Sequence, residues 1–190
     1  SGKSFTMVFL SKALILHDDL RRCRIVVVTD RVQLEDQLSG VFRSSGELSS
    51  KKDYAKSIAT SGKRLAQQIG KGSERIIFSL IQKFNTATTL PDCHNESADI
   101  IVLIDEVHRS QGGEANARMH AALPNAAFVG FTGTPLLKDD KTTSKFGPIL
   151  HAYTMQRAVE DEAVTPLLYE ERIPDLDINQ RAIDKWFERI

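Results

Sequence analysis

Four short, continuous runs of apolar residues are the feature that most constrains how this chain can fold. They fall at residues 24–29, 75–79, 100–104 and 127–132, and the third consists of five consecutive aliphatic residues. Runs of this length without polar alternation indicate strands that are buried on both faces. Helical patterns separate the runs. The sequence therefore predicts an α/β fold with a mainly parallel sheet that carries helices on both faces.

The stretches between the runs predict helices. Residues 4–16 are apolar almost all round, which is typical of a helix packed closely against a sheet. Asp30 is expected to cap the next helix, in which apolar residues recur at helical spacing. A further helix is expected near residues 63–69. Residues 43–54 are rich in Ser and Lys and are expected to form a loop.

The C-terminal part of the chain has a different pattern. Thr154 is expected to cap a short helix that ends near Ala163, after which Pro166 breaks it. Residues 167–173 are expected to form a strand or an extended connector, and residues 178–190 an amphipathic helix. We therefore expect one domain over residues 1–166 and a connecting segment over residues 167–190.

Composition excludes some classes of protein. The 25 Lys and Arg balance the 25 Asp and Glu, so a strongly basic nucleic-acid grip is absent in bulk, although a local basic stripe needs only a few donors. Cys23 and Cys93 fit neither a disulfide framework nor a zinc pattern, which indicates a reducing, cytoplasmic compartment. No apolar run approaches the length of a membrane span, so no membrane is expected among the partners.

Three short motifs carry chemistry. In the first, Gly2-Lys3-Ser4, the glycine lets backbone amides close on phosphates, the lysine reaches the outer phosphates and the serine hydroxyl holds magnesium. The apolar helix that follows is the context such a phosphate loop requires. Alone, the triplet is more often a surface turn. The chain contains no earlier glycine of the full pattern.

The second motif is a pair of adjacent carboxylates, Asp105 and Glu106, directly after the aliphatic run. Two carboxylates at the end of a buried strand cost desolvation and repel each other, and a cation offsets that cost. One would join a magnesium shell while the other positions and deprotonates water. A solvated acidic turn is the alternative. Ligands of α/β proteins bind at this edge of the sheet, which favours the functional interpretation. The third motif, residues 131–135, is a common turn when taken by itself.

In this order the three motifs resemble those of superfamily 2 helicases and translocases. Residues 29–37 resemble the D-R-x-x-L-x-x-Q form of motif Ia, and residues 79–84 and 105–111 resemble the I-Q-K-F and D-E-x-H-R-S-Q segments. Matches continue from residue 146 to residue 170. The combination is similar to the motor (R) subunit of type I restriction enzymes over nearly the whole chain.

The resemblance implies a RecA-like P-loop domain whose first strand precedes the phosphate loop and is missing from this sequence. It also implies ATP and Mg²⁺ as cofactors, with Lys3 and Glu106 as the catalytic residues. The residues expected to bind nucleotide are Gly2, Lys3, Ser4, Asp105, His108 and Arg109, and magnesium would be held by Ser4 and Asp105. For His108, a packing or capping role is the alternative.

The resemblance further implies that Thr132, Gly133 and Thr134 couple hydrolysis to movement. Candidates for DNA contact are Arg31, Gln33, Gln82 and Lys83, for which a solvated surface is equally plausible. The expected partners are double-stranded DNA, methyltransferase and specificity subunits, and a second motor domain of the same parent chain. The domain would move DNA before cleavage by a nuclease site outside this chain.

Two other functions compete with that expectation. The chain by itself is expected to be inactive, because half of the ATP site would come from the second motor domain. It could thus serve only as a DNA-binding or subunit-binding module. A P-loop kinase is a weaker alternative, since it gives no reason for the carboxylate motif and the T-G-T-P motif to occur together.

Overall fold

The computed structural model describes residues 2–46, 50–106, 113–133 and 147–166. The chain divides into two units, residues 1–148 and 149–190, which are treated separately. The first unit contains the sheet and the two motifs with ionisable side chains. The second contains one short helix among the described residues.

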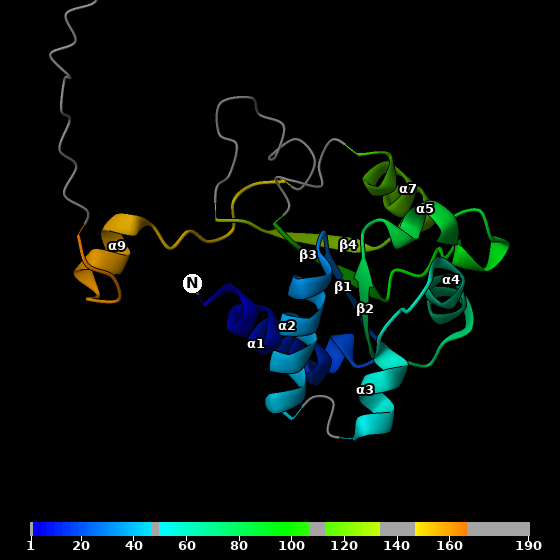
Figure 1. Cartoon of the computed structure of the whole chain (residues 1–190), viewed down its shortest axis with the longest axis horizontal. Coiled ribbons are helices and arrows are strands. Elements are labelled where there is room, and N and C mark those ends of the chain that lie inside the picture. Colours follow the sequence, from blue (N-terminus) through cyan, green and yellow to red (C-terminus); the bar gives the residue numbers. More distant parts are fainter. Residues whose placement is uncertain (1, 47–49, 107–112, 134–146, 167–190) are drawn as a thin grey trace, which may run out of the picture. The chain divides into compact units, whose positions relative to one another are not determined.

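A four-stranded parallel sheet forms the centre of the first unit (Figure 1). Its order is β2-β1-β3-β4, and its strands are β1 (Arg24–Thr29), β2 (Ile76–Leu80), β3 (Ile100–Asp105) and β4 (Ala127–Phe131). All three neighbouring pairs run parallel. The predicted α/β fold with a parallel sheet is confirmed, and the carboxyl ends of all four strands meet at one edge.

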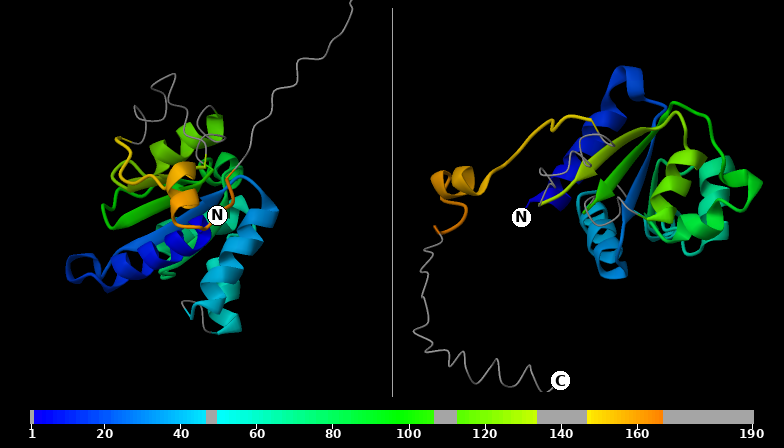
Figure 2. Two further views of the ribbon diagram at one scale, coloured as in Figure 1. Left: turned by 90° about the vertical axis from the view of Figure 1, so that its left-hand side faces the viewer. Right: turned by 90° about the horizontal axis from the view of Figure 1, so that it is seen from above.

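Helices cover both faces of this sheet (Figure 2). One face carries α1 (Lys3–Leu16) and α2 (Val32–Ser44); the other carries α4 (Gly62–Lys71), α5 (Lys83–Ala87) and α7 (Glu114–Ala122). Successive residues of a strand point to opposite faces. In β1, Ile25 and Val27 accordingly pack in one hydrophobic cluster, and Val26 and Val28 in the other. The apolar runs of the sequence are continuous because both faces are buried.

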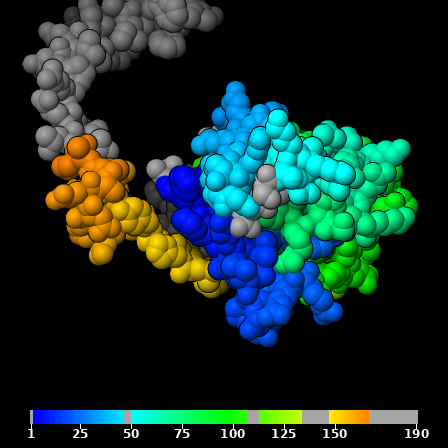
Figure 3. All heavy atoms as spheres, turned by 90° about the horizontal axis from the view of Figure 1, so that it is seen from below, coloured from blue at the N-terminus to red at the C-terminus, as the bar shows by residue number. Residues whose placement is uncertain are grey.

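Short elements complete the unit. They are α3 (Lys51–Ser57) and the 3₁₀ turns η1 (Asp18–Leu20) and η2 (Pro91–Cys93). Figure 3 shows the surface where α1, in dark blue, adjoins α2. On α1, Phe5, Phe9 and Leu16 are exposed, whereas Met7 and Val8 are fully buried. The predicted packing of this helix against the sheet is confirmed on its buried side, although the opposite side leaves large apolar residues exposed.

Two local predictions are wrong. Asp30 does not cap α2: the capping position is Arg31, whose carbonyl accepts the first helical hydrogen bonds, and no side chain caps this end. Residues 43–54 are not one loop, because α2 continues to Ser44 and α3 begins at Lys51. The signal for α3 was present, since Ser50 accepts the Asp53 amide and donates to the Asp53 carboxylate.

The two edges of the sheet differ in burial. β2 is buried along nearly its whole length, and the backbone beside it pairs through Ile58 with Phe78. In β4 no residue is fully buried. The predicted strand before the phosphate loop stays a prediction. The half-exposed β4 is an edge at which a further parallel strand could pair.

In the second unit, α9 (Met155–Glu160) begins where the sequence predicts. The Thr154 hydroxyl accepts a hydrogen bond from the Arg157 amide at 3.2 Å, as an N-cap does. The helix ends at Glu160, a few residues before the predicted end. The predicted connector at 167–173 and the helix at 178–190 lie outside the described residues. The domain boundary at residue 166 thus stays a prediction.

Candidate nucleotide site

The phosphate-loop motif lies at the start of α1. Gly2 is the capping residue, and its carbonyl accepts both the amide and the hydroxyl of Thr6. The first turn contains no acidic residue and no side chain caps it. The positive end of the helix dipole and its first amides therefore remain suited to an anion. Ser4 lies in this turn, partly buried.

The carboxylate motif lies at the end of β3, on the carboxyl edge of the sheet. Asp105 is the last residue of the strand and only 7% exposed, and its Oδ1 accepts the Glu106 amide at 3.0 Å. Glu106 has a positive φ of 50°. The left-handed region costs a residue with a side chain on the order of 1–2 kcal/mol, and such strain is concentrated at functional sites.

Lys3 joins the two motifs across 103 residues of sequence. Its Nζ donates to Glu106 Oε1 and lies 3.7 Å from Asp105 Oδ1. The three ionisable residues on which the ATPase interpretation depends therefore meet at one point. The cation of the phosphate loop is paired with the carboxylate predicted to be the catalytic base.

Burial dominates the electrostatics of Asp105. Desolvation raises the pKa of its carboxyl group, and the negative charge of Glu106 adds to the rise. Lys3 and the Glu106 amide oppose it without cancelling it. A buried carboxylate in this state is stabilised by an additional cation.

The oxygen donors at this point suit magnesium. Hydroxyl and carboxylate oxygens such as those of Ser4 and Asp105 are its preferred ligands, and it commonly takes one or two carboxylates together with substrate phosphates. Within residues 2–46, 50–106, 113–133 and 147–166, no cluster of three or more His, Cys, Asp or Glu forms a metal cage.

The T-G-T-P motif follows β4 at the same edge. Phe131 pairs with Asp105 in the sheet, so Thr132 and Gly133 follow β4 at the edge where the carboxylates follow β3. Thr132 is half-buried and Gly133 is exposed. Thr134 lies outside the described residues. His108 and Arg109 also lie outside them, so their predicted places beside the nucleotide stay predictions.

The four DNA-contact candidates divide into two kinds. Arg31 and Gln33 are exposed at the start of α2. Gln82 and Lys83 both have hydrogen-bonded partners: the exposed Gln82 side-chain amide donates to the Asp30 carbonyl at 2.9 Å, and the largely buried Lys83 pairs with Glu35 at 3.1 Å. The side chains of Gln82 and Lys83 thus already have partners within the protein, which the sequence alone did not show.

Glu35 is the residue that sequence reasoning missed. It is 6% exposed and lies on the buried face of α2, three residues before Leu38 and seven before Phe42. A charged residue in register with the apolar face of a helix is the signal that could have drawn attention to it. Buried carboxylates of this kind need a paired cation.

A phosphate loop at the start of α1, opposite two carboxylates at the end of β3, defines the class of P-loop ATPases. Residues 1–190 match the SWI2/SNF2 ATPase family, so the chain belongs to that family. The resemblance to superfamily 2 motors seen in the sequence is thereby confirmed.

Relatives of known name are type I restriction enzyme subunits. The chain is 36% identical over 195 residues to the putative type I restriction enzyme MjaIXP endonuclease subunit of Methanocaldococcus jannaschii, with 100% of the chain and 18% of the relative covered. It is 35% identical over 205 residues to the type I restriction enzyme HindI endonuclease subunit of Haemophilus influenzae, covering 100% and 19%. The chain thus spans less than one fifth of the length of these relatives.

A more distant relative comes from Staphylococcus saprophyticus. The match to its type I restriction enzyme SsaAORF53P endonuclease subunit is 29% identical over 174 residues and covers 85% of the chain and 17% of the relative.

Among the helices that the structure describes, none is both long and apolar enough to cross a bilayer.

Proposed function

We propose that this chain is the ATP-binding and ATP-hydrolysing motor domain of a DNA translocase, within the R subunit of a type I restriction enzyme. One observation carries the proposal: Lys3 at the start of α1 meets Asp105 and Glu106 at the carboxyl edge of the sheet. Membership of the SWI2/SNF2 ATPase family and the names of the relatives support it.

The phosphate end of ATP would bind at the first turn of α1. Gly2 and the first amides of the helix would contact phosphate oxygens, and Lys3 would exchange Glu106 for the outer phosphates. Ser4 and Asp105 would hold Mg²⁺, which supplies charge neutralisation for the phosphoryl group in transfer. The exchange would leave the Glu106 carboxylate able to orient a water molecule and accept its proton.

Movement on DNA would be coupled to this site through the neighbouring strand ends. Thr132, Gly133 and Thr134 follow β4, whose last residue pairs with Asp105. His108 and Arg109 come two and three residues after Glu106 in the sequence. A change in the bonding of the carboxylates would thus act on both segments through short stretches of backbone.

The proposed setting is a larger cytoplasmic complex. Its members would be methyltransferase and specificity subunits, a second motor domain of the same parent chain and double-stranded DNA. The names of the relatives support the restriction-enzyme setting, because each is an endonuclease subunit of a type I enzyme.

ATP hydrolysis by the complete natural chain, measured with and without double-stranded DNA, tests the proposal. We expect Lys3→Ala and Glu106→Gln each to lower the DNA-stimulated rate by about 100-fold or more, the range for a lost electrostatic donor or general base. Lys71→Ala is the control, since this exposed lysine pairs with Asp92 away from the site.

Full activity in both site variants would refute the assignment of Lys3 and Glu106. If the wild-type protein bound DNA but hydrolysed no ATP, the alternative function, a DNA-binding or subunit-binding module, would replace the proposed one.

A further inference from the structure

Three consecutive residues at the β2–α5 corner all contact the β1–α2 corner. We call this set of contacts the 81–83 clamp. Its hydrogen bonds run from the Ile81 amide to the Thr29 carbonyl at 2.8 Å, from the Gln82 side-chain amide to the Asp30 carbonyl at 2.9 Å, and from Lys83 Nζ to the Glu35 carboxylate oxygens at 3.1 and 3.3 Å. Each residue thus has a separate partner on the neighbouring corner.

The ion pair of the clamp is well shielded from water. The side chains of Lys83 and Glu35 are only 16% and 7% exposed. The next residue, Phe84, is fully buried in the core on the other face of the sheet. The buried Phe84 therefore holds the backbone beside Lys83 in place. If Lys83 contacted a DNA phosphate instead, the buried Glu35 carboxylate would be left unpaired, which is costly.

The clamped corner lies beside the nucleotide carboxylates. Val28 pairs with Ile104 in the sheet, so Thr29, where the clamp begins, is level with Asp105. Two residues after Thr29, the exposed Arg31 is the N-cap of α2, with its Nε 3.8 Å from the Asp30 carboxylate, and the exposed Gln33 lies in the first turn of the helix. The clamp thus holds an exposed basic residue and an exposed amide at a fixed place next to the ATPase site.

We propose that Gln82 and Lys83 are positioning residues and not DNA ligands: they hold the β1–α2 corner so that Arg31 and Gln33 meet the DNA backbone. The inference rests on the proposed function, because it assigns roles within the same DNA-dependent ATPase. It divides the four polar residues of motif Ia and the I-Q-K-F segment into two ligands and two supports.

The salt dependence of DNA binding distinguishes a phosphate ligand from a support. Each phosphate neutralised by a Lys or Arg contributes about 0.9 to the slope of log K against log salt concentration. In the complete natural chain, we expect Arg31→Ala to lower this slope by about 0.9. We expect Lys83→Met to leave the slope unchanged while raising the DNA concentration for half-maximal ATPase stimulation by about tenfold, equivalent to a coupling loss of about 1.4 kcal/mol.

Two further variants keep the test decisive if Lys83→Met folds poorly. The charge exchange Glu35→Lys/Lys83→Glu keeps an ion pair at this place with its charges reversed. If the ion pair itself holds the corner, this variant should restore the half-saturating DNA concentration to within about threefold of wild type. The double variant Glu35→Met/Lys83→Met removes both charges from a buried site, a change that proteins often tolerate. It should keep the wild-type salt slope.

The Arg64–Glu74 ion pair provides a matched control at the opposite end of β2. Arg64 Nη2 and Glu74 Oε1 are 2.7 Å apart. Glu74 precedes β2 in the chain, whereas Lys83 follows it. Glu74→Gln should lower thermal stability without changing the half-saturating DNA concentration.

A drop of about 0.9 in the salt slope of Lys83→Met or of the double methionine variant, without rescue by the charge exchange, would overturn the positioning role. It would make Lys83 a DNA ligand and leave the proposed function intact. Failure of the wild-type protein to bind DNA would refute the proposed function, and the clamp inference would fall with it.

Discussion

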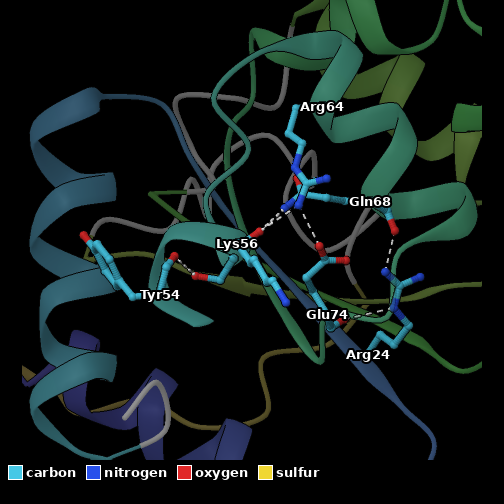
Figure 4. A network of polar contacts seen from close by, with 7 residues as sticks. Arg24, Tyr54, Lys56, Arg64, Gln68 and Glu74 are labelled. Atoms are coloured by element: carbon cyan, nitrogen blue, oxygen red, sulfur yellow. Dashed lines mark hydrogen bonds and ion pairs between the residues drawn. The ribbon is translucent and has the colours of Figure 1, made fainter. Parts of the chain in front are cut away.

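Arg24 at the start of β1 provides the sharpest test of how the sheet is held to α4 (Figure 4). Its guanidinium donates to the Gln68, Ile69 and Glu74 carbonyls, the last two at 3.1 Å. Gln68 and Ile69 belong to the last turn of α4, where the helix runs out of amides to satisfy its carbonyls; Gln68 still accepts the Gly72 amide. Burial lowers the pKa of Arg24, and the charge of Glu74 opposes that shift. The side chain is therefore a cationic cap on the negative end of a helix.

The magnitude follows from what each carbonyl keeps when Arg24 is replaced by Met. A hydrogen bond from a charged donor is worth about 1.5–3 kcal/mol. The Gln68 carbonyl keeps the Gly72 amide at 3.1 Å, and the Ile69 carbonyl keeps the Asn95 side-chain amide at 2.7 Å. Because two of the three acceptors stay partly satisfied, we expect a loss of about 2–4 kcal/mol and not the full value of three bonds.

Hydrogen exchange of the complete natural chain, read by mass spectrometry, measures this loss locally. A loss of about 2–4 kcal/mol corresponds to exchange that is roughly 30- to 700-fold faster in β1 and α4. Arg21→Met is the control: Arg21 pairs with Asp18 at 2.5 Å, but both side chains are largely exposed. Such a surface pair contributes at most about 1 kcal/mol. If Arg24→Met accelerated exchange no more than Arg21→Met, the capping role of Arg24 would be refuted.

Two further predictions concern packing and pH. A Cβ on Gly70 would collide with the Asp92 carbonyl, so Gly70→Ala should lower the free energy of unfolding in urea by about 1–3 kcal/mol. Gly40 lies in the interior of α2 with open space around a Cβ, so Gly40→Ala should raise that free energy by about 0.5–1 kcal/mol. Equal effects of the two changes would contradict the close approach of α4 to η2. Burial raises the pKa of the Cys93 thiol from 9.0 to about 11, so the unfolded chain loses this proton first. Stability should therefore fall as the pH rises from 9.0 towards 11, by up to about 2–3 kcal/mol, and Cys93→Ala should flatten the curve of the unfolding midpoint against pH.

Much of the fold was predictable because local sequence and burial agree. The β1 strand occupies the residues that its β-branched run indicates, and the other three strands begin or end within one or two residues of prediction. One predicted helix cap was wrong. Asp30 has the right chemistry for a cap, but its carbonyl is bonded to Gln82 and the helix begins one residue beyond Arg31. A contact from the corner between β2 and α5 thus accompanies the loss of a local preference.

For the candidate site, the sequence by itself determined which groups carry the chemistry: Lys3, Asp105 and Glu106 stand in motifs whose order and context are visible in one dimension. Only the tertiary structure decided which polar residues are already committed. Lys83 and Arg31 are both basic residues near strand ends, yet one is paired in a buried site and the other is exposed. The partner of Lys83 lies 48 residues away on another helix. Parallel strands bring their carboxyl ends together regardless of separation along the chain, so such pairings depend on the register of the sheet and not on spacing in the sequence.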